Sequence, residues 1–153
     1  MPVDRGEACT KAAVHRFRVR VYYEDTDAGG VVYHASYLRF AERARTEMLR
    51  EKGFVQSQLS KELGIFFVLR HCVADFVAPA RLDDDLLVAT RLVDLRGASL
   101  DLEQIIWRDR LALVRLGVKL ACMSERGRAA RFPGEVRAAL AELSGNIWTD
   151  NGK

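Results

Sequence analysis

The sequence lacks a long apolar run, a set of paired cysteines and a strong excess of charge of either sign. No stretch approaches the roughly 18 apolar residues that a membrane-spanning helix needs, and no basic segment followed by an apolar one opens the chain. We therefore expect no membrane span and no secretion signal. The net charge is +3, from 24 basic and 21 acidic residues, and this mild excess does not indicate a nucleic-acid partner.

The three cysteines form an odd number with no close pairing, which does not indicate a disulfide framework. Cys72 and Cys122 fall inside apolar strand-like patterns, so we expect reduced thiols in the core. Cys9 lies in a polar segment near the beginning of the chain, and we expect it to be exposed. Reduced thiols favour a cytoplasmic location.

The length of 153 residues suits one domain with a hydrophobic core and is too short for two ordinary domains. The composition, 49% hydrophobic and 29% charged, is typical of a soluble globular protein. We predict a loose leader over residues 1–13, a single domain over residues 14–145 and a tail over residues 146–153.

The order of the expected elements is one strand, a long helix, four further strands and a short terminal helix. Alternation of apolar and polar residues indicates the strands, and apolar positions spaced by three and four indicate the long helix. This order predicts an α+β fold with an antiparallel five-stranded sheet. The predicted strands span 17–23, 65–78, 86–95, 100–107 and 112–123, and the predicted helices span 35–52, 54–63 and a segment that begins at Pro133.

The stretch from Arg20 to Arg45 joins the first strand to the long helix through an acidic, glycine-rich turn. Asp27 lies in this turn, and the helix begins near His34. Free backbone N–H groups in a first helical turn stabilise a developing oxyanion, while a nearby carboxylate attacks a carbonyl or deprotonates water. The arrangement favours acyl transfer or hydrolysis. The alternative is that the acidic residues only cap the helix.

The same stretch resembles the signature of the 4-hydroxybenzoyl-CoA thioesterase family, which has the hotdog fold. The matching residues are Arg20-Val21, Thr26-Asp27, Gly30-Val31-Val32 and Tyr37. The longer segment VYYEDTDAGGVVYHASY is similar to the corresponding segment of the acyl-CoA thioesterases associated with the bacterial Tol-Pal system. The resemblance continues through APARLDD and RGASL to about Met123. It implies a sheet wrapped around a long central helix, and a chain that hydrolyses acyl-CoA thioesters.

The resemblance places the family's catalytic carboxylate on Asp27, as nucleophile or general base. It also implies that the backbone N–H at His34 polarises the thioester carbonyl, and it leaves a role for the His34 side chain open. Tyr23, next to the turn, is a further catalytic candidate that would hold Asp27 or water, or else an aromatic side chain that packs under the helix. Glu42 is a carboxylate on the helix that we assign to its salt-bridged face.

Three candidate substrate-binding residues lie far from this turn in the sequence. Arg96 and Ser99 occupy a predicted hairpin, and Lys119 lies on the polar face of the last strand. We predict that Arg96 and Lys119 contact the phosphates of coenzyme A, with solvated charges as the alternative, and that Ser99 is a further substrate-binding residue. Coenzyme A is then part of the substrate, and we expect no cofactor.

A metal site is not expected. Glu24 and Asp25 add carboxylates near Asp27 and His34, but the turn lacks a second histidine. His15 and His71 have no partner visible in the sequence, and we assign them no role.

The resemblance also implies partners. Related hotdog proteins form their pocket between two chains, so we expect a homodimer or homotetramer. An alternative function is a non-catalytic adaptor that binds acyl carrier protein or cell-envelope partners. We expect no nucleic-acid partner.

Overall fold

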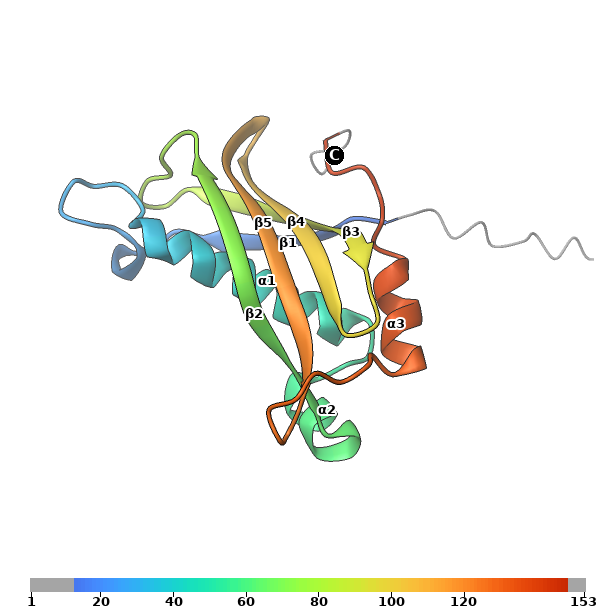
Figure 1. Ribbon diagram of the computed structural model, residues 1–153. Coiled ribbons are helices and arrows are strands. Elements are labelled where there is room, and N and C mark those ends of the chain that lie inside the picture. The colour runs from blue at the N-terminus through green and yellow to red at the C-terminus, as the bar shows by residue number, and fades with distance from the viewer. Residues whose placement is uncertain (1–12, 149–153) are drawn as a thin grey trace, which may run out of the picture.

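The computed structural model describes residues 13–148, so most of the predicted leader, including Cys9, and residues 149–153 lie outside the described part of the chain. The elements in chain order are β1 His15–Arg20, η1 Tyr23–Asp25, α1 His34–Glu51, α2 Gln56–Leu63, β2 Ile65–Phe76, β3 Asp85–Leu95, β4 Ser99–Arg108, β5 Leu111–Ser124 and α3 Gly134–Ala141 (Figure 1).

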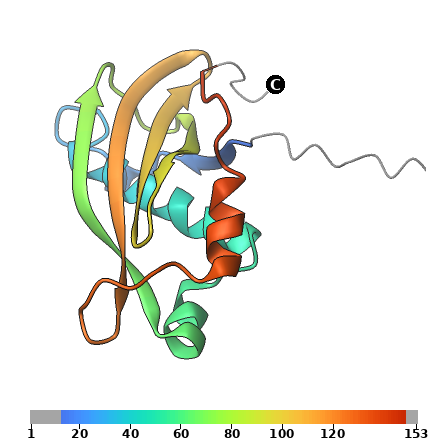
Figure 2. The same cartoon turned by 45° about the vertical axis from the view of Figure 1, so that its right-hand side comes forward.

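The five strands form one antiparallel sheet in the order β1-β3-β4-β5-β2. The sheet curves around α1, which runs across its concave face, while α3 covers one end of the core (Figure 2). Both the α+β class and the central helix predicted from the sequence are confirmed.

The apolar stripe of α1 is buried as its periodicity predicted. Phe40, Ala41 and Ala44 have no exposed surface, and Met48 is 2% exposed. The inner face of β5 packs against this stripe, since its apolar side chains alternate with outward-facing polar ones. This packing holds the first turn of α1 at one end of the sheet.

The first strand ends earlier than predicted. The sequence pattern indicated a strand through Tyr23, whereas β1 ends at Arg20 and a 3-10 turn begins at Tyr23. The cause is the buried carboxylate of Asp25, whose Oδ2 accepts a hydrogen bond from the Tyr22 N–H at 2.8 Å. Tyr22 and Tyr23, which continue the alternation in the sequence, therefore lie outside β1.

A polar network that the sequence pattern did not reveal lies between α1 and the sheet. The buried Arg45 guanidinium donates to Gln104 Oε1 at 2.8 Å, and burial lowers the pKa of Arg45. Gln104 Nε2 donates in turn to the Ala41 carbonyl and to Thr90 Oγ1, both at 3.0 Å. Gln104 thus supplies an acceptor to a buried charge, which is costly to leave unpaired.

The outer face of the sheet, turned away from α1, carries a smaller apolar cluster. Part of the predicted tail packs there: Ile147 is 1% exposed, and the Trp148 ring meets the Trp107 ring edge-on at 5.7 Å. The cluster comprises Leu87, Ala89, Ile105, Trp107 and Ile147. The fold therefore uses both faces of β3 and β4.

Replacing Gln104 by Leu is expected to lower the free energy of unfolding by about 2–4 kcal/mol, because it leaves the Arg45 guanidinium buried without its acceptor. Urea unfolding measures this change. Gln58→Leu, on the exposed side of α2, is the control and is expected to shift stability by no more than about 0.5 kcal/mol. Equal stability of the two variants would contradict the assigned role of the network.

Candidate active site

The Asp27 carboxylate is held by the turn in which it lies. Its Oδ1 accepts hydrogen bonds from the N–H groups of Gly29, at 2.8 Å, and Val31, at 3.4 Å. Gly30 has a φ of 79°, a left-handed conformation that favours glycine and closes the turn. Among the described residues no donor contacts Oδ2, and the side chain is exposed. One carboxylate oxygen is thus fixed while the other is available for chemistry.

The first turn of α1 follows directly. Thr26 bridges to Val32, and the Tyr33 N–H donates to the Asp25 carbonyl at 2.8 Å, so the chain folds back and enters the helix beside the acidic turn. Tyr33, the N-cap residue, makes no capping hydrogen bond with its side chain. Within residues 13–148 the N–H groups of His34 and Ala35 are therefore available to an external acceptor at the positive end of the helix dipole.

Aromatic rings surround the His34 side chain. Its imidazole lies 4.3 Å from the Tyr33 ring and 6.4 Å from the Phe76 ring, centroid to centroid. The ring of Phe76 also lies 5.8 Å from that of Tyr37. The exposed His34 thus stands where the end of β2 meets the start of α1.

The Tyr37 hydroxyl pins the first turn of the helix to the loop before β3. It accepts a hydrogen bond from the Ala80 N–H at 2.9 Å, and burial raises the pKa of Tyr37. The Ala80 carbonyl accepts in turn from the Val32 N–H at 2.8 Å. Ala80, in the APARLDD segment noted in the sequence, therefore holds the first turn of α1 and the end of the acidic turn together.

An ion pair between Arg108 and Asp84 stabilises the loop before β3. Arg108 donates to Asp84 Oδ2 at 2.9 Å and to the Pro79 carbonyl at 3.1 Å, and the Arg81 N–H also donates to Asp84 Oδ2, at 2.8 Å. Partial burial works against the charged form, but these donors prevail and lower the pKa of Asp84. Sequence analysis missed Arg108 and Asp84, which are 24 residues apart and meet only in the folded sheet.

The other acidic and aromatic candidates of the turn have separate surroundings. Asp25 is buried and engaged with the Tyr22 N–H, whereas Glu24 and Tyr23 are exposed, Tyr23 at 81%. Packing of Tyr23 under the helix is therefore not what this chain shows. Across residues 13–148 no group of three His, Cys, Asp or Glu side chains is placed to hold a metal ion.

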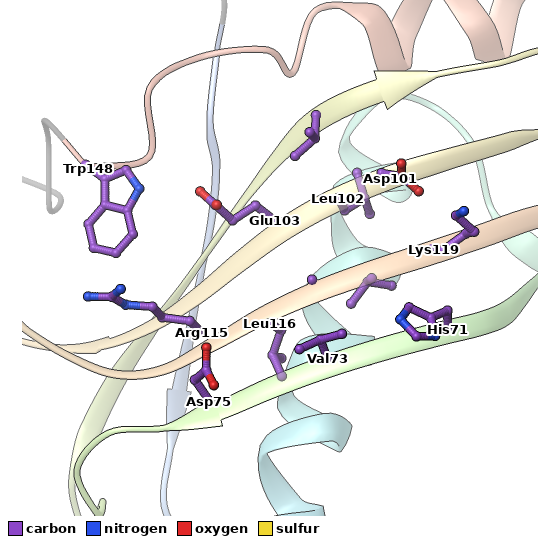
Figure 3. A pocket seen from close by; sticks show the side chains of 13 residues that line it. His71, Val73, Asp75, Asp101, Leu102, Glu103, Arg115, Leu116, Lys119 and Trp148 are labelled. Carbon is purple, nitrogen blue, oxygen red and sulfur yellow. The ribbon is translucent and has the colours of Figure 1, made fainter.

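The predicted phosphate contacts are not brought to the acidic turn within one chain. Arg96 and Ser99 lie in the β3–β4 hairpin, at the opposite end of the sheet from the start of α1 (Figure 1). Arg96 donates to Ser99 Oγ at 2.8 Å and to both carboxylate oxygens of Asp101, at 2.9 and 3.0 Å. Lys119 lies on the outer face of the sheet (Figure 3).

Two small cavities lie between α1 and the inner faces of β2 and β5. One of about 100 Å³ begins beside Leu38 and Cys72, and one of about 80 Å³ continues toward Met48 and Phe67. Both share Leu69, Glu42 and Arg45 as lining residues. They follow α1 from its first turns toward its C-terminal half.

Comparison with known proteins agrees with this geometry. Residues 21–140 match the thioesterase-like superfamily. The acyl-CoA thioesterase YbgC of Haemophilus influenzae is 48% identical over 128 residues, which cover 83% of this chain and 94% of that protein. The acyl-CoA thioester hydrolase YbgC of Escherichia coli O6:H1 is 57% identical over 91 residues, or 60% of this chain and 67% of that one.

A solved structure shows the same fold. The probable thioesterase from Bartonella henselae has a TM-score of 0.77 and 43% identity, covering 79% of this chain and all of that one. The predicted hotdog fold is thereby confirmed.

Replacing Arg108 by Gln is expected to lower the free energy of unfolding by about 1–2 kcal/mol at neutral pH, because Asp84 loses a charged donor. The folded-state pKa of Asp84 lies below its usual range, near 3.9 in unfolded chains, so this contribution is present above that pH. It should disappear as the pH falls through the lower folded-state pKa.

Urea unfolding of both proteins from pH 7 to pH 3 measures this difference, with Arg110→Gln in the adjacent exposed turn as the control. A gap between wild type and Arg108→Gln that stays constant down to pH 3 would show that the charge of Asp84 is not involved.

Proposed function

The chain belongs to the thioesterase-like superfamily, and on this premise we propose that it hydrolyses acyl-CoA thioesters to the free acid and coenzyme A. The observation that carries the proposal is the free Oδ2 of Asp27 beside the uncapped first turn of α1. The names of the YbgC relatives support the same activity.

In the proposed reaction the thioester carbonyl oxygen accepts hydrogen bonds from the N–H groups of His34 and Ala35. As the carbonyl carbon becomes tetrahedral, the negative charge on this oxygen lies at the positive end of the helix dipole. These donors are already fixed by the packing of α1, so no rearrangement is needed to stabilise the transition state.

Asp27 Oδ2 then acts in one of two ways. As nucleophile it bonds to the carbonyl carbon, the C–S bond breaks, the coenzyme A thiolate leaves and is protonated, and water hydrolyses the acyl-aspartyl anhydride. As general base it takes a proton from a water molecule that attacks the carbon, and the same C–S bond breaks. The hydrogen bonds from Gly29 and Val31 to Oδ1 suit both routes, because they fix the direction of Oδ2.

His34 and Tyr23 are proposed as auxiliary groups. The exposed imidazole of His34, between Tyr33 and Phe76, is available to protonate the leaving thiolate. The Tyr23 backbone carbonyl accepts a hydrogen bond from the Thr26 hydroxyl at 2.9 Å, and the exposed Tyr23 side chain is proposed to hold Asp27 or water.

The acyl chain is proposed to enter the cavities between α1 and β2, which begin one turn beyond His34. Of the three substrate-binding candidates, Lys119 has no ion-pair partner among the described residues, whereas Arg96 already pairs with Asp94 and Asp101. We retain all three as proposed contacts, with those in the hairpin supplied from another chain.

The active form is proposed to be a homodimer or dimer of dimers. The 12-residue strand β2 lies at the edge of the sheet and exposes Phe66, Leu69, Val73 and Phe76 by 40–53%. A long apolar edge strand is a template for pairing with another strand. Since Phe76 touches His34, a partner on this edge would approach the catalytic turn.

The proposal extends to the cellular location of the protein and to its association with other proteins. No helix within residues 13–148 is long and apolar enough to cross a membrane. We propose a cytoplasmic protein, and an association with the Tol-Pal system that rests on the resemblance of the signature.

Replacing Asp27 by Asn is expected to lower kcat at least 100-fold, since the carboxylate charge is lost while an amide oxygen keeps the bonds from Gly29 and Val31. Release of thiol from acyl-CoAs of short, long and aromatic acyl groups measures it. Glu24→Gln, an exposed neighbour, is the matched control and should keep wild-type turnover.

Full turnover by Asp27→Asn would exclude Asp27 as the catalytic carboxylate. The same panel tests the adaptor alternative: no hydrolysis of any acyl-CoA by the wild-type protein, together with stable binding of acyl carrier protein, would favour a binding role over catalysis.

The dimer is tested by Phe66→Lys, which places a charge on the β2 edge and is expected to weaken self-association at least tenfold. Activity per chain should fall in parallel upon dilution. Sedimentation at the assay concentration is the measurement, with Leu63→Lys on exposed α2 as control. A fully active monomer would exclude a shared site.

A further inference from the structure

A hollow of about 510 Å³ lies on the outer face of the sheet, turned away from α1 (Figure 3). Gly117 of β5 lies at its floor. A Cβ at this position would meet nothing within 4 Å, although glycine weakens a strand interior. A glycine inside a strand often marks a bulge, a bend, or a place where a ligand or another backbone approaches closely.

The two ends of the hollow differ in chemistry. At one end the Arg115 guanidinium lies 4.6 Å from the centroid of the Trp148 ring, which is 43% exposed. At the other end His71 and Lys119 are register neighbours on β2 and β5 and lie side by side in Figure 3. An aromatic platform and a cationic corner thus flank Gly117.

The acidic residues near the hollow are largely engaged. Asp101 accepts two hydrogen bonds from Arg96, which lower its pKa, and Glu103 accepts one from Arg91 at 3.1 Å. Asp75 is the register neighbour of Arg115. Asp101 is also the register neighbour of Lys119 on β5, and the charge of Lys119 helps to lower its pKa. Arg115 and Lys119 thus place one cation at each end of the hollow.

The distance between the two ends of the hollow indicates the size of a ligand that would reach both. Arg115 and Lys119 are four residues apart on one strand, which corresponds to roughly 14 Å at about 3.4 Å per residue. A planar ring that stacks on Trp148 and a phosphate at Lys119, joined across Gly117, match a nucleoside di- or triphosphate or the nucleotide end of coenzyme A.

We propose that the outer-face hollow around Gly117 binds a nucleoside polyphosphate moiety, with the base on Trp148 and Arg115 and the phosphates on Lys119 and His71. Within one chain this hollow lies on the face of the sheet turned away from α1. Lys119 is also one of the coenzyme A contacts proposed above, so the test distinguishes free nucleotide from coenzyme A.

Trp148 supplies the readout, since the chain has only two tryptophans and Trp107 is 5% exposed. ADP titrated into the full chain is expected to quench the fluorescence with a submillimolar Kd, and adenosine or inorganic phosphate should bind at least tenfold more weakly. Coenzyme A is titrated in parallel: equal binding of ADP points to free nucleotide, and clearly tighter coenzyme A points to the substrate. Trp148→Phe should abolish the signal.

Gly117→Leu fills the floor and should abolish binding while keeping or raising Tm, because a side chain fits and the strand gains rigidity. Lys119→Gln should weaken ADP binding about tenfold, whereas Arg126→Gln, an exposed turn residue, should not change it. The proposal is overturned if neither ADP nor coenzyme A quenches Trp148, or if Gly117→Leu retains its Tm and binds ADP as wild type does.

Discussion

Burial of α1 against the concave face of the sheet is the constraint on which the rest of the structure depends. Phe40, Ala41 and Ala44 have no exposed surface, so the helix cannot shift without opening a cavity. The bond between the Tyr37 hydroxyl and the Ala80 N–H fixes its first turn against the loop before β3. The free N–H groups of that turn are thereby preorganised beside Asp27, which is the condition for electrostatic stabilisation of an oxyanion.

The elements that depend on local periodicity were predictable from the sequence. In β5, Val114, Leu116 and Val118 alternate with outward-facing polar residues, and the strand forms where this pattern lies. The end of β1 was predicted wrongly, because alternation cannot reveal that the Asp25 carboxylate accepts a bond from the backbone and turns the chain. The packing of Ile147 on the outer face also depends on contacts across the sheet.

The candidate site was predictable only where its residues are neighbours in the chain. Asp27 and His34 share one segment, so a turn that leads into a helix sufficed to find them. The pairing of Asp84 with Arg108 requires β3 and β4 to be aligned, and the buried contact of Arg45 with Gln104 requires α1 to lie on the sheet. Neither residue of the second pair breaks the local pattern enough to reveal a partner 59 residues away.

The central claim is that the first turn of α1 and the Asp27 carboxylate act on the same carbonyl group. A crystal structure of the Asp27→Asn variant with an acyl-CoA analogue, in which a methylene replaces the thioester sulfur, tests it most directly. The account predicts the carbonyl oxygen at about 2.7–3.1 Å from the N–H groups of His34 and Ala35, with the carbonyl carbon facing residue 27. A carbonyl bound elsewhere, with these two N–H groups open to solvent, would contradict it.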